Sequence, residues 1–155
     1  MKAITIRQPW ATLIALGEKK YETRSWQTKY RGPLAIHASK KGDLEAFFRP
    51  EIKEALEKHG IEYFEDLTTG AIIAIGELVD CYRIEEKETT GARLSNGEYV
   101  CDEEFMFGDY GVGRFAWKLE DAIELTKPVP AKGKLNLWEY EGDLFETSKS
   151  TDTNA

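Results

Sequence analysis

The feature that most constrains the fold is a nearly continuous apolar run, GAIIAIGELVDCYRI, at residues 70–84. Such a run, bounded by turn residues, is typical of a strand in the centre of a sheet or barrel. Several other segments have the alternating pattern of strands, and a last strand segment is expected near the C-terminal end of the domain. They are residues 2–8, 21–26, 34–39, 114–126 and 128–140. The sequence therefore predicts a sheet organised around residues 70–84.

Helical patterns interrupt these strands at three places. Pro9 precedes WATLIALG, in which apolar residues recur at helical spacing until Gly17. A second helical pattern starts at Asp43, and a third runs from Pro50 to Gly60. Because strands and helices do not alternate regularly, we predict an α+β fold, with a small mixed β-barrel flanked by two to four helices.

Length and composition narrow the class of protein. A chain of 155 residues with 41% hydrophobic residues is near the usual size of one domain with one core. We expect one domain over residues 1–143 and a disordered tail at 144–155, where the apolar pattern ends. No apolar run reaches membrane-spanning length and the start lacks a signal-peptide pattern, so we expect a cytoplasmic location and no membrane partner.

Cysteine and histidine are scarce. The chain has two cysteines, Cys81 and Cys101, and two histidines, His37 and His59. These residues are too few to predict a disulfide framework or a four-ligand zinc site. We therefore expect no resident metal and no cofactor.

The net charge of -7 hides a strong asymmetry along the chain. Residues 1–41 hold nine Lys or Arg against two Glu, whereas the remainder holds twelve Lys or Arg against twenty-six acidic residues. A basic segment on an acidic body can form a localised anion-binding surface. Alternatively, these basic side chains scatter over several faces.

Residues 17–26, GEKKYETRSW, lack the apolar face of an ordinary strand. Glu22 and Arg24 are two residues apart and share a face. If that face is buried, the two side chains must find partners, and they are expected to pair and to line a pocket. The alternative is an edge strand with solvated charges.

The pattern Gly17-x-Lys19-x-x-Glu22-x-Arg24 matches the G-x-K-x-x-E-x-R signature of ASCH domains, the activating signal cointegrator homology family. The surrounding sequence agrees with this family at several further places. They are IRQPWA at 6–11, IHASK at 36–40, GAIIAIGEL at 70–78, GRFAW at 113–117, and Lys132-Gly133 followed by Leu137-Trp138. The chain thus resembles this family from Ile4 to Tyr140, which implies a single ASCH domain with a PUA-like fold.

The resemblance also implies a function. Family members are thought to bind RNA or nucleotide-like ligands in a cleft beside the barrel, which is lined here by Lys19, Glu22 and Arg24. Some members resemble magnesium-dependent nucleases that cut single-stranded RNA. A shorter branch comprises amidohydrolases of N4-acylated cytidines, which have a Thr where this chain has Glu22. Thr23 is adjacent to that position.

Elementary chemistry suggests a role for each signature residue. The ammonium group of Lys19 can bind phosphate or, if desolvated, act as a general base. Glu22 can orient Lys19 or ligate Mg²⁺, so these two residues are the catalytic candidates if the protein is an enzyme. The planar guanidinium of Arg24 can bind phosphate or stack on a base.

Further residues complete the predicted ligand site. His37, Ser39 and Lys40 end one strand and can form a second polar wall, although His37 also fits a structural role. Trp26 is the best candidate for an exposed base-stacking ring, whereas Trp10, Trp117 and Trp138 are expected in the interior. Arg114 and Lys132 add positive charge. The predicted binding residues are Lys19, Glu22, Arg24, Trp26, His37, Ser39, Lys40, Arg114 and Lys132.

Three functions compete on this basis. We favour a module that binds single-stranded RNA, a nucleotide or a nucleoside, because no nucleophile with a matching base is visible. A hydrolase acting through the same cleft, with Mg²⁺ if it is a nuclease, is the second hypothesis. The third is a protein partner for the acidic segment 85–104, whose turn residues Gly91 and Asn96-Gly97 suggest a mobile flap.

Overall fold

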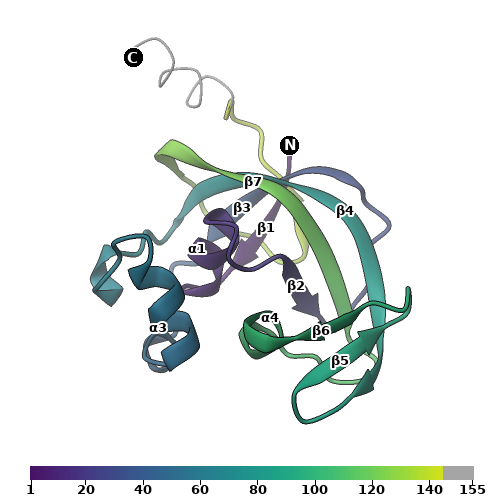
Figure 1. Cartoon of the computed structure of the whole chain (residues 1–155). Helices are drawn as coiled ribbons and strands as arrows, with labels where there is room; N and C mark the ends of the chain where they lie inside the picture. Colours follow the sequence, from purple (N-terminus) through teal and green to yellow (C-terminus); the bar gives the residue numbers. More distant parts are fainter. Residues whose placement is uncertain (145–155) are drawn as a thin grey trace.

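The computed structural model describes residues 1–144, which form an eight-stranded sheet with four α-helices (Figure 1). Six strands follow one another in a single path. In spatial order they are β2 (Tyr21–Arg24), β7 (Phe115–Pro130), β4 (Ala71–Lys87), β3 (Gly32–Ala38), β1 (Lys2–Ile6) and β8 (Leu137–Glu139). β1 and β3 are parallel, and the other pairs are antiparallel. The predicted α+β class is confirmed, and the apolar run at 70–84 lies in β4 near the middle of the sheet.

The predicted barrel does not close. Within residues 1–144, β2 pairs only with β7 and β8 pairs only with β1, so the two ends of the sheet stay apart. The free edge of β2 has its polar backbone groups satisfied by side chains. Glu104 accepts from the Tyr21 N–H at 3.3 Å, and Arg114 donates to the Thr23 carbonyl at 3.3 Å. These two backbone groups therefore do not need a neighbouring strand as a partner.

The long strands β4 and β7 bend around the first helix, α1 (Trp10–Ala15), as Figure 1 shows. Their pairing shifts register at three places, and such irregularities bend a sheet. Ala11 and Ile14 of α1 pack against Leu78 and Trp117 inside this curve. The helix ends as predicted, because Gly17 adopts a φ of 77° that favours glycine.

The next helices cover one side of α1. α2 (Leu44–Phe47) is capped by Asp43, whose side chain accepts a 3.0 Å bond from the Ala46 N–H, and α3 (Pro50–Glu57) begins at Pro50. A short 3-10 helix, η1 (Phe64–Asp66), follows. Leu13 of α1 packs here against Phe47 and Leu56.

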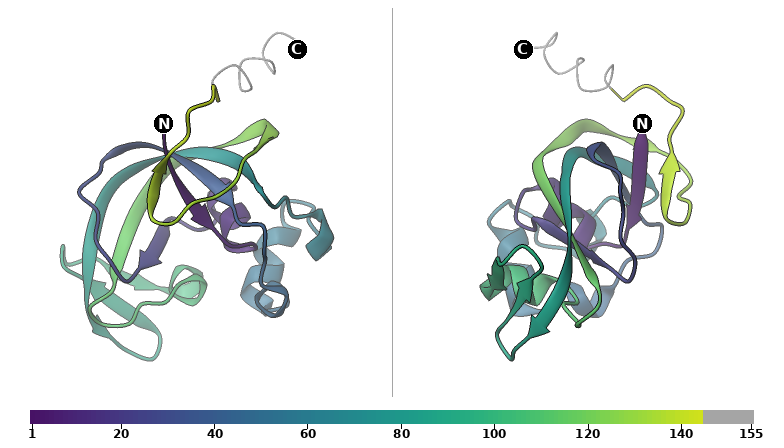
Figure 2. Two further views of the ribbon diagram at one scale, coloured as in Figure 1. Left: turned by 180° about the vertical axis from the view of Figure 1, so that it is seen from behind. Right: turned by 90° about the vertical axis from the view of Figure 1, so that its right-hand side faces the viewer.

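Residues 85–104 are folded, not a charged loop. They contain the end of β4, then β5 (Gly91–Leu94) and β6 (Tyr99–Cys101), and they lead into α4 (Asp102–Phe107). Ala92, Leu94 and Val100 are buried against Tyr110. The predicted turn at Asn96-Gly97 is present, but Gly91, also predicted in a turn, is the first residue of β5. The strands were missed because their apolar residues are few and are separated by charges. Figure 2 shows this hairpin at the end of the sheet that is remote from the N-terminus.

The C-terminal strand β8 returns beside β1, so the first and last strands lie together (Figure 2). Leu144 is buried in a small cluster with Trp138. The rest of the predicted tail, residues 145–155, lies outside the described residues. None of the helices in the described part of the chain is long and apolar enough to cross a bilayer.

Candidate functional site

A cleft of about 490 Å³ lies between the end of β1 and the strand β2, which is one of the two unpaired edges of the sheet within residues 1–144. The turn after α4 and the start of α3 complete its walls. Its charged lining residues are Arg7, Lys19, Glu22, Arg24, Arg49, Asp109 and Arg114. Five cations against two carboxylates give this cleft, here named the arginine cleft, a formal excess of three positive charges.

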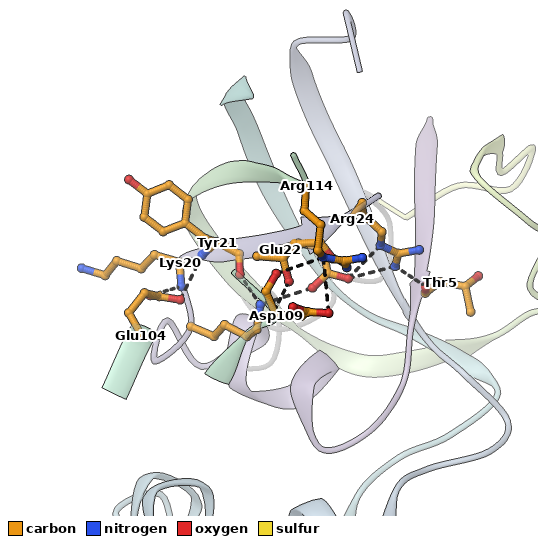
Figure 3. A network of polar contacts seen from close by, with 10 residues as sticks. Thr5, Lys20, Tyr21, Glu22, Arg24, Glu104, Asp109 and Arg114 are labelled. Atoms are coloured by element: carbon orange, nitrogen blue, oxygen red, sulfur yellow. Dashed lines mark hydrogen bonds and ion pairs between the residues drawn. The ribbon is translucent and has the colours of Figure 1, made fainter. Parts of the chain in front are cut away.

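The carboxylate of Glu22 is held between two cations. Its Oε1 lies 3.2 Å from the Lys19 ammonium. Its Oε2 accepts a 2.9 Å bond from Nε of Arg24 (Figure 3). Lys19 also donates to the backbone carbonyl of Tyr21. These contacts bring the three signature residues into one network, as their spacing predicts.

Lys19 forms the buried floor of this network. Its side chain is only 2% exposed. The turn that follows Gly17 places it there, because the Lys19 N–H donates to the Leu13 carbonyl at 3.0 Å. A buried ammonium needs a counter-charge, and Glu22 supplies it.

Two guanidinium groups form the wall that a ligand can reach. Arg24 donates to the Thr5 carbonyl at 2.8 Å, and its side chain is 24% exposed. Arg114 donates to the carbonyls of Asp109 and Thr23, at 3.0 and 3.3 Å, and is 30% exposed. Both groups are fixed by the backbone and keep an exposed side.

Among the cleft residues that the sequence did not predict as site residues are Trp10, Arg7 and Arg49. Trp10, predicted to be interior, lines the cleft, and the Arg49 guanidinium lies 5.9 Å from its ring centroid. Arg7 is exposed at the end of β1. Its place within the IRQPWA motif was the only signal for it. No local pattern marks Arg49, because its role depends on the packing of α3 near α1.

Glu104 fastens α4 to the start of β2. Its carboxylate accepts a 2.7 Å bond from the Lys20 N–H and a 3.3 Å bond from the Tyr21 N–H (Figure 3). Burial raises the pKa of Glu104, and the nearby Lys19 charge opposes this rise. The same β2 edge that lines the cleft therefore depends on a carboxylate from a distant segment.

Four of the five remaining predicted binding residues lie in a second cleft. His37, Ser39, Lys40 and Lys132 line a hollow of about 750 Å³, named here the lysine cleft. Thr5 lines both clefts. The structure thus divides the predicted site in two.

Trp26 is outside both clefts. It is partly buried, and its ring packs edge-to-face on Trp117 with centroids 4.7 Å apart. The expected exposed stacking ring is therefore absent at Trp26. Trp10 occupies the cleft instead.

The basic N-terminal segment is only partly gathered. Arg7, Lys19 and Arg24 line the arginine cleft, and Lys40 lines the lysine cleft. Arg31 instead forms an ion pair with Asp80 at 3.2 Å, away from both. Some basic side chains of residues 1–41 thus gather at a localised surface, whereas others are scattered over other faces.

The carboxylates of the arginine cleft do not suit Mg²⁺. Glu22 contacts Lys19 and Arg24, and Asp109 Oδ2 lies 3.5 Å from Nε of Arg114. Magnesium prefers oxygen ligands that are free of competing cations. No group of three metal-ligating side chains occurs among residues 1–144.

Comparisons with known proteins agree with the sequence pattern. A family model described as the ASCH domain matches residues 4–129. Activating signal cointegrator 1 of Homo sapiens and that of Mus musculus are each 25% identical over 153 residues, which cover 94% of this chain. The chain spans only 23% of either relative. The crystal structure of ASCH from Zymomonas mobilis superposes with a TM-score of 0.54 at 13% identity, covering 96% of this chain and 93% of that one. This last likeness concerns the fold alone.

Proposed function

Because this chain belongs to the ASCH domain family, we propose that its arginine cleft binds single-stranded RNA or a nucleotide-like ligand. The observation that carries the proposal is the pair of anchored guanidinium groups. Arg24 and Arg114 are each held by backbone carbonyls and each keep an exposed side. A fixed planar fork loses little freedom when it binds a phosphate or a base edge.

The other cations extend this surface. Arg7 and Arg49 are exposed on the cleft wall, and Arg49 lies over Trp10. An aromatic ring beside guanidinium groups is a common arrangement for unstacked bases. Outside residues 1–41 the chain carries twenty-six acidic residues against twelve basic ones, so non-specific binding of RNA over the rest of the surface is disfavoured.

A hydrolase is the second candidate, and the buried Lys19–Glu22 pair favours it. A desolvated ammonium beside a carboxylate can move a proton during attack on an amide. Thr23 also lines the cleft, but its hydroxyl accepts a 3.0 Å bond from the Asp109 N–H. Amide hydrolysis of an N4-acylated cytidine suits this set better than magnesium-dependent cleavage, since both cleft carboxylates contact cations.

Fluorescence polarisation with a labelled single-stranded RNA octanucleotide tests the binding function. Arg24→Lys should weaken binding about tenfold, because an ammonium cannot hold Glu22, the Thr5 carbonyl and a phosphate together. Arg31→Lys is the matched control, since Arg31 pairs with Asp80 outside the clefts. Equal losses of affinity in both variants, or no binding by the unmodified protein, would contradict the proposal.

The same samples separate the hydrolase. The RNA is examined for fragments with Mg²⁺ and with EDTA, and N4-acetylcytidine is incubated in parallel. Release of cytidine that is abolished in Glu22→Gln but kept in Arg31→Lys would establish the second candidate.

A further inference from the structure

The lysine cleft has the charge of an anion site. Three ammonium groups and no carboxylate line it; they belong to Lys40, Lys132 and Lys134. None of the three forms an ion pair with another residue in the part of the chain that the structure describes. On a chain with a net charge of -7, an unneutralised lysine cluster around a hollow is unusual.

The two clefts lie side by side at one edge of the sheet. β1 and β3 are parallel, with Thr5 opposite His37, so their carboxyl ends meet at the same edge. Thr5 stands between the clefts. Its carbonyl accepts from Arg24, whereas its hydroxyl accepts a 3.1 Å bond from the indole N–H of Trp138.

The wall of the lysine cleft is held by buried contacts. Nε2 of His37 donates to the Ala131 carbonyl at 2.7 Å, and the His37 side chain is 2% exposed. Gly133 packs against the same ring so closely that a β-carbon there would lie 2.8 Å from Cε1 of His37. The segment that carries Lys132 and Lys134 is therefore anchored to β1 and β3. Nδ1 of His37 is buried with no hydrogen-bond partner within residues 1–144.

We propose that the lysine cleft is a second subsite for the same single-stranded RNA, so that one strand crosses Thr5 and contacts both clefts. This inference rests on the proposed function of the arginine cleft. A nucleic-acid strand carries a phosphate at every nucleotide, and each cleft offers cations to a different one. A nucleoside monophosphate has only one phosphate group to offer to the two clefts. The natural ligand is therefore a strand of several nucleotides, not a free nucleotide.

The test compares labelled single-stranded RNAs of increasing length over a range of salt concentrations. The unmodified protein should bind an octanucleotide more tightly than a dinucleotide. The double substitution Lys132→Ala and Lys134→Ala should weaken octanucleotide binding about tenfold and leave dinucleotide binding unchanged. Affinity falls as salt concentration rises, and in this variant it should fall less steeply. The slope of log affinity against log salt should become less negative by about 0.7 for each phosphate that the variant no longer neutralises.

The matched control is Lys29→Ala with Lys87→Ala, which removes two exposed lysines outside both clefts. If both double variants weaken binding equally, the effect is one of net charge and the second subsite is disproved. If the unmodified protein binds the dinucleotide and the octanucleotide equally, the second subsite is also disproved, but the arginine cleft remains a binding site. If it binds neither RNA, the proposed function itself fails.

Discussion

Nε of Arg24 donates a 2.9 Å hydrogen bond to Oε2 of Glu22, its neighbour on the same face of β2. The other oxygen of this carboxylate lies 3.2 Å from the buried ammonium of Lys19. One anion therefore neutralises a buried cation and orients a partly exposed one. This arrangement couples the stability of the fold to the shape of the arginine cleft.

Glu22→Gln should destabilise the protein by about 3 kcal/mol. The substitution keeps the shape of the side chain but leaves Lys19, which is 2% exposed, without its counter-charge. Urea unfolding followed by circular dichroism measures the change in stability.

The control for this prediction is Glu57→Gln. Glu57 pairs with Lys53 at 3.3 Å on the surface of α3, and both side chains are more than a third exposed. Removing this charge should change the free energy of unfolding by less than about 0.5 kcal/mol. Similar effects in the two variants would show that burial of the Lys19 charge is unimportant.

The stability of the protein should depend on pH through Glu104. Burial raises the pKa of this carboxyl from its ordinary value of 4.5. Because the pKa of Glu104 is higher in the folded than in the unfolded state, the folded state binds the proton more tightly than the unfolded state does. As pH rises between these two pKa values, this group therefore lowers the free energy of unfolding. Urea unfolding of the unmodified protein and of Glu104→Gln from pH 4 upward, at steps of about half a unit, isolates the contribution.

As pH rises through this window, the unmodified protein should lose unfolding free energy relative to Glu104→Gln. Glu103→Gln removes an exposed charge from the same helix and reports the effect of net charge alone. A difference that moves the opposite way with pH would mean that contacts with Lys20 and Tyr21 outweigh the cost of burial.

Gly133→Ala should destabilise the protein by about 1 to 3 kcal/mol. A β-carbon would lie 2.7 Å from Oγ1 of Thr5, which accepts from Trp138, and 3.0 Å from Nδ1 of His37, whose ring is held by the bond from Nε2 to the Ala131 carbonyl. Thermal unfolding measures the cost.

Gly76→Ala provides the comparison. A β-carbon at Gly76 in β4 would meet its nearest neighbour at 3.6 Å, which is ordinary contact, and its φ lies outside the left-handed region. This variant should be neutral or stabilising by up to about 1 kcal/mol, because alanine is less flexible than glycine in the unfolded chain. An equal destabilisation at both positions would reject the proposed packing of Gly133 on His37.

Local signals in the sequence predicted the elements whose ends are set by a single residue. Gly17 follows the end of α1 because it readily adopts a positive φ, and Pro50 begins α3 because its ring fixes φ at a helical value. Both effects act within one turn of the chain. The strands β5 and β6 were not predicted. Their pairing depends on contacts with β4 and with Tyr110, which no local period records.

The candidate site shows the same division. The spacing of Glu22 and Arg24 predicted that they share a face, and the structure pairs them. Arg49 and Asp109 come from other elements and had no local signal. Trp26 and Trp10 are both partly buried against the core, but only Trp10 lines the arginine cleft, because Trp26 packs on Trp117 outside it.

The sequence by itself determined the family, the α+β class and the face on which the signature residues meet, because these depend on residue spacing within single elements. Only the tertiary structure decided that the sheet stays open between β2 and β8 and that most of the predicted site residues lie in two clefts that share Thr5. Strand order and the convergence of distant side chains depend on the total burial and hydrogen bonding of the whole chain, to which each residue contributes only a small part.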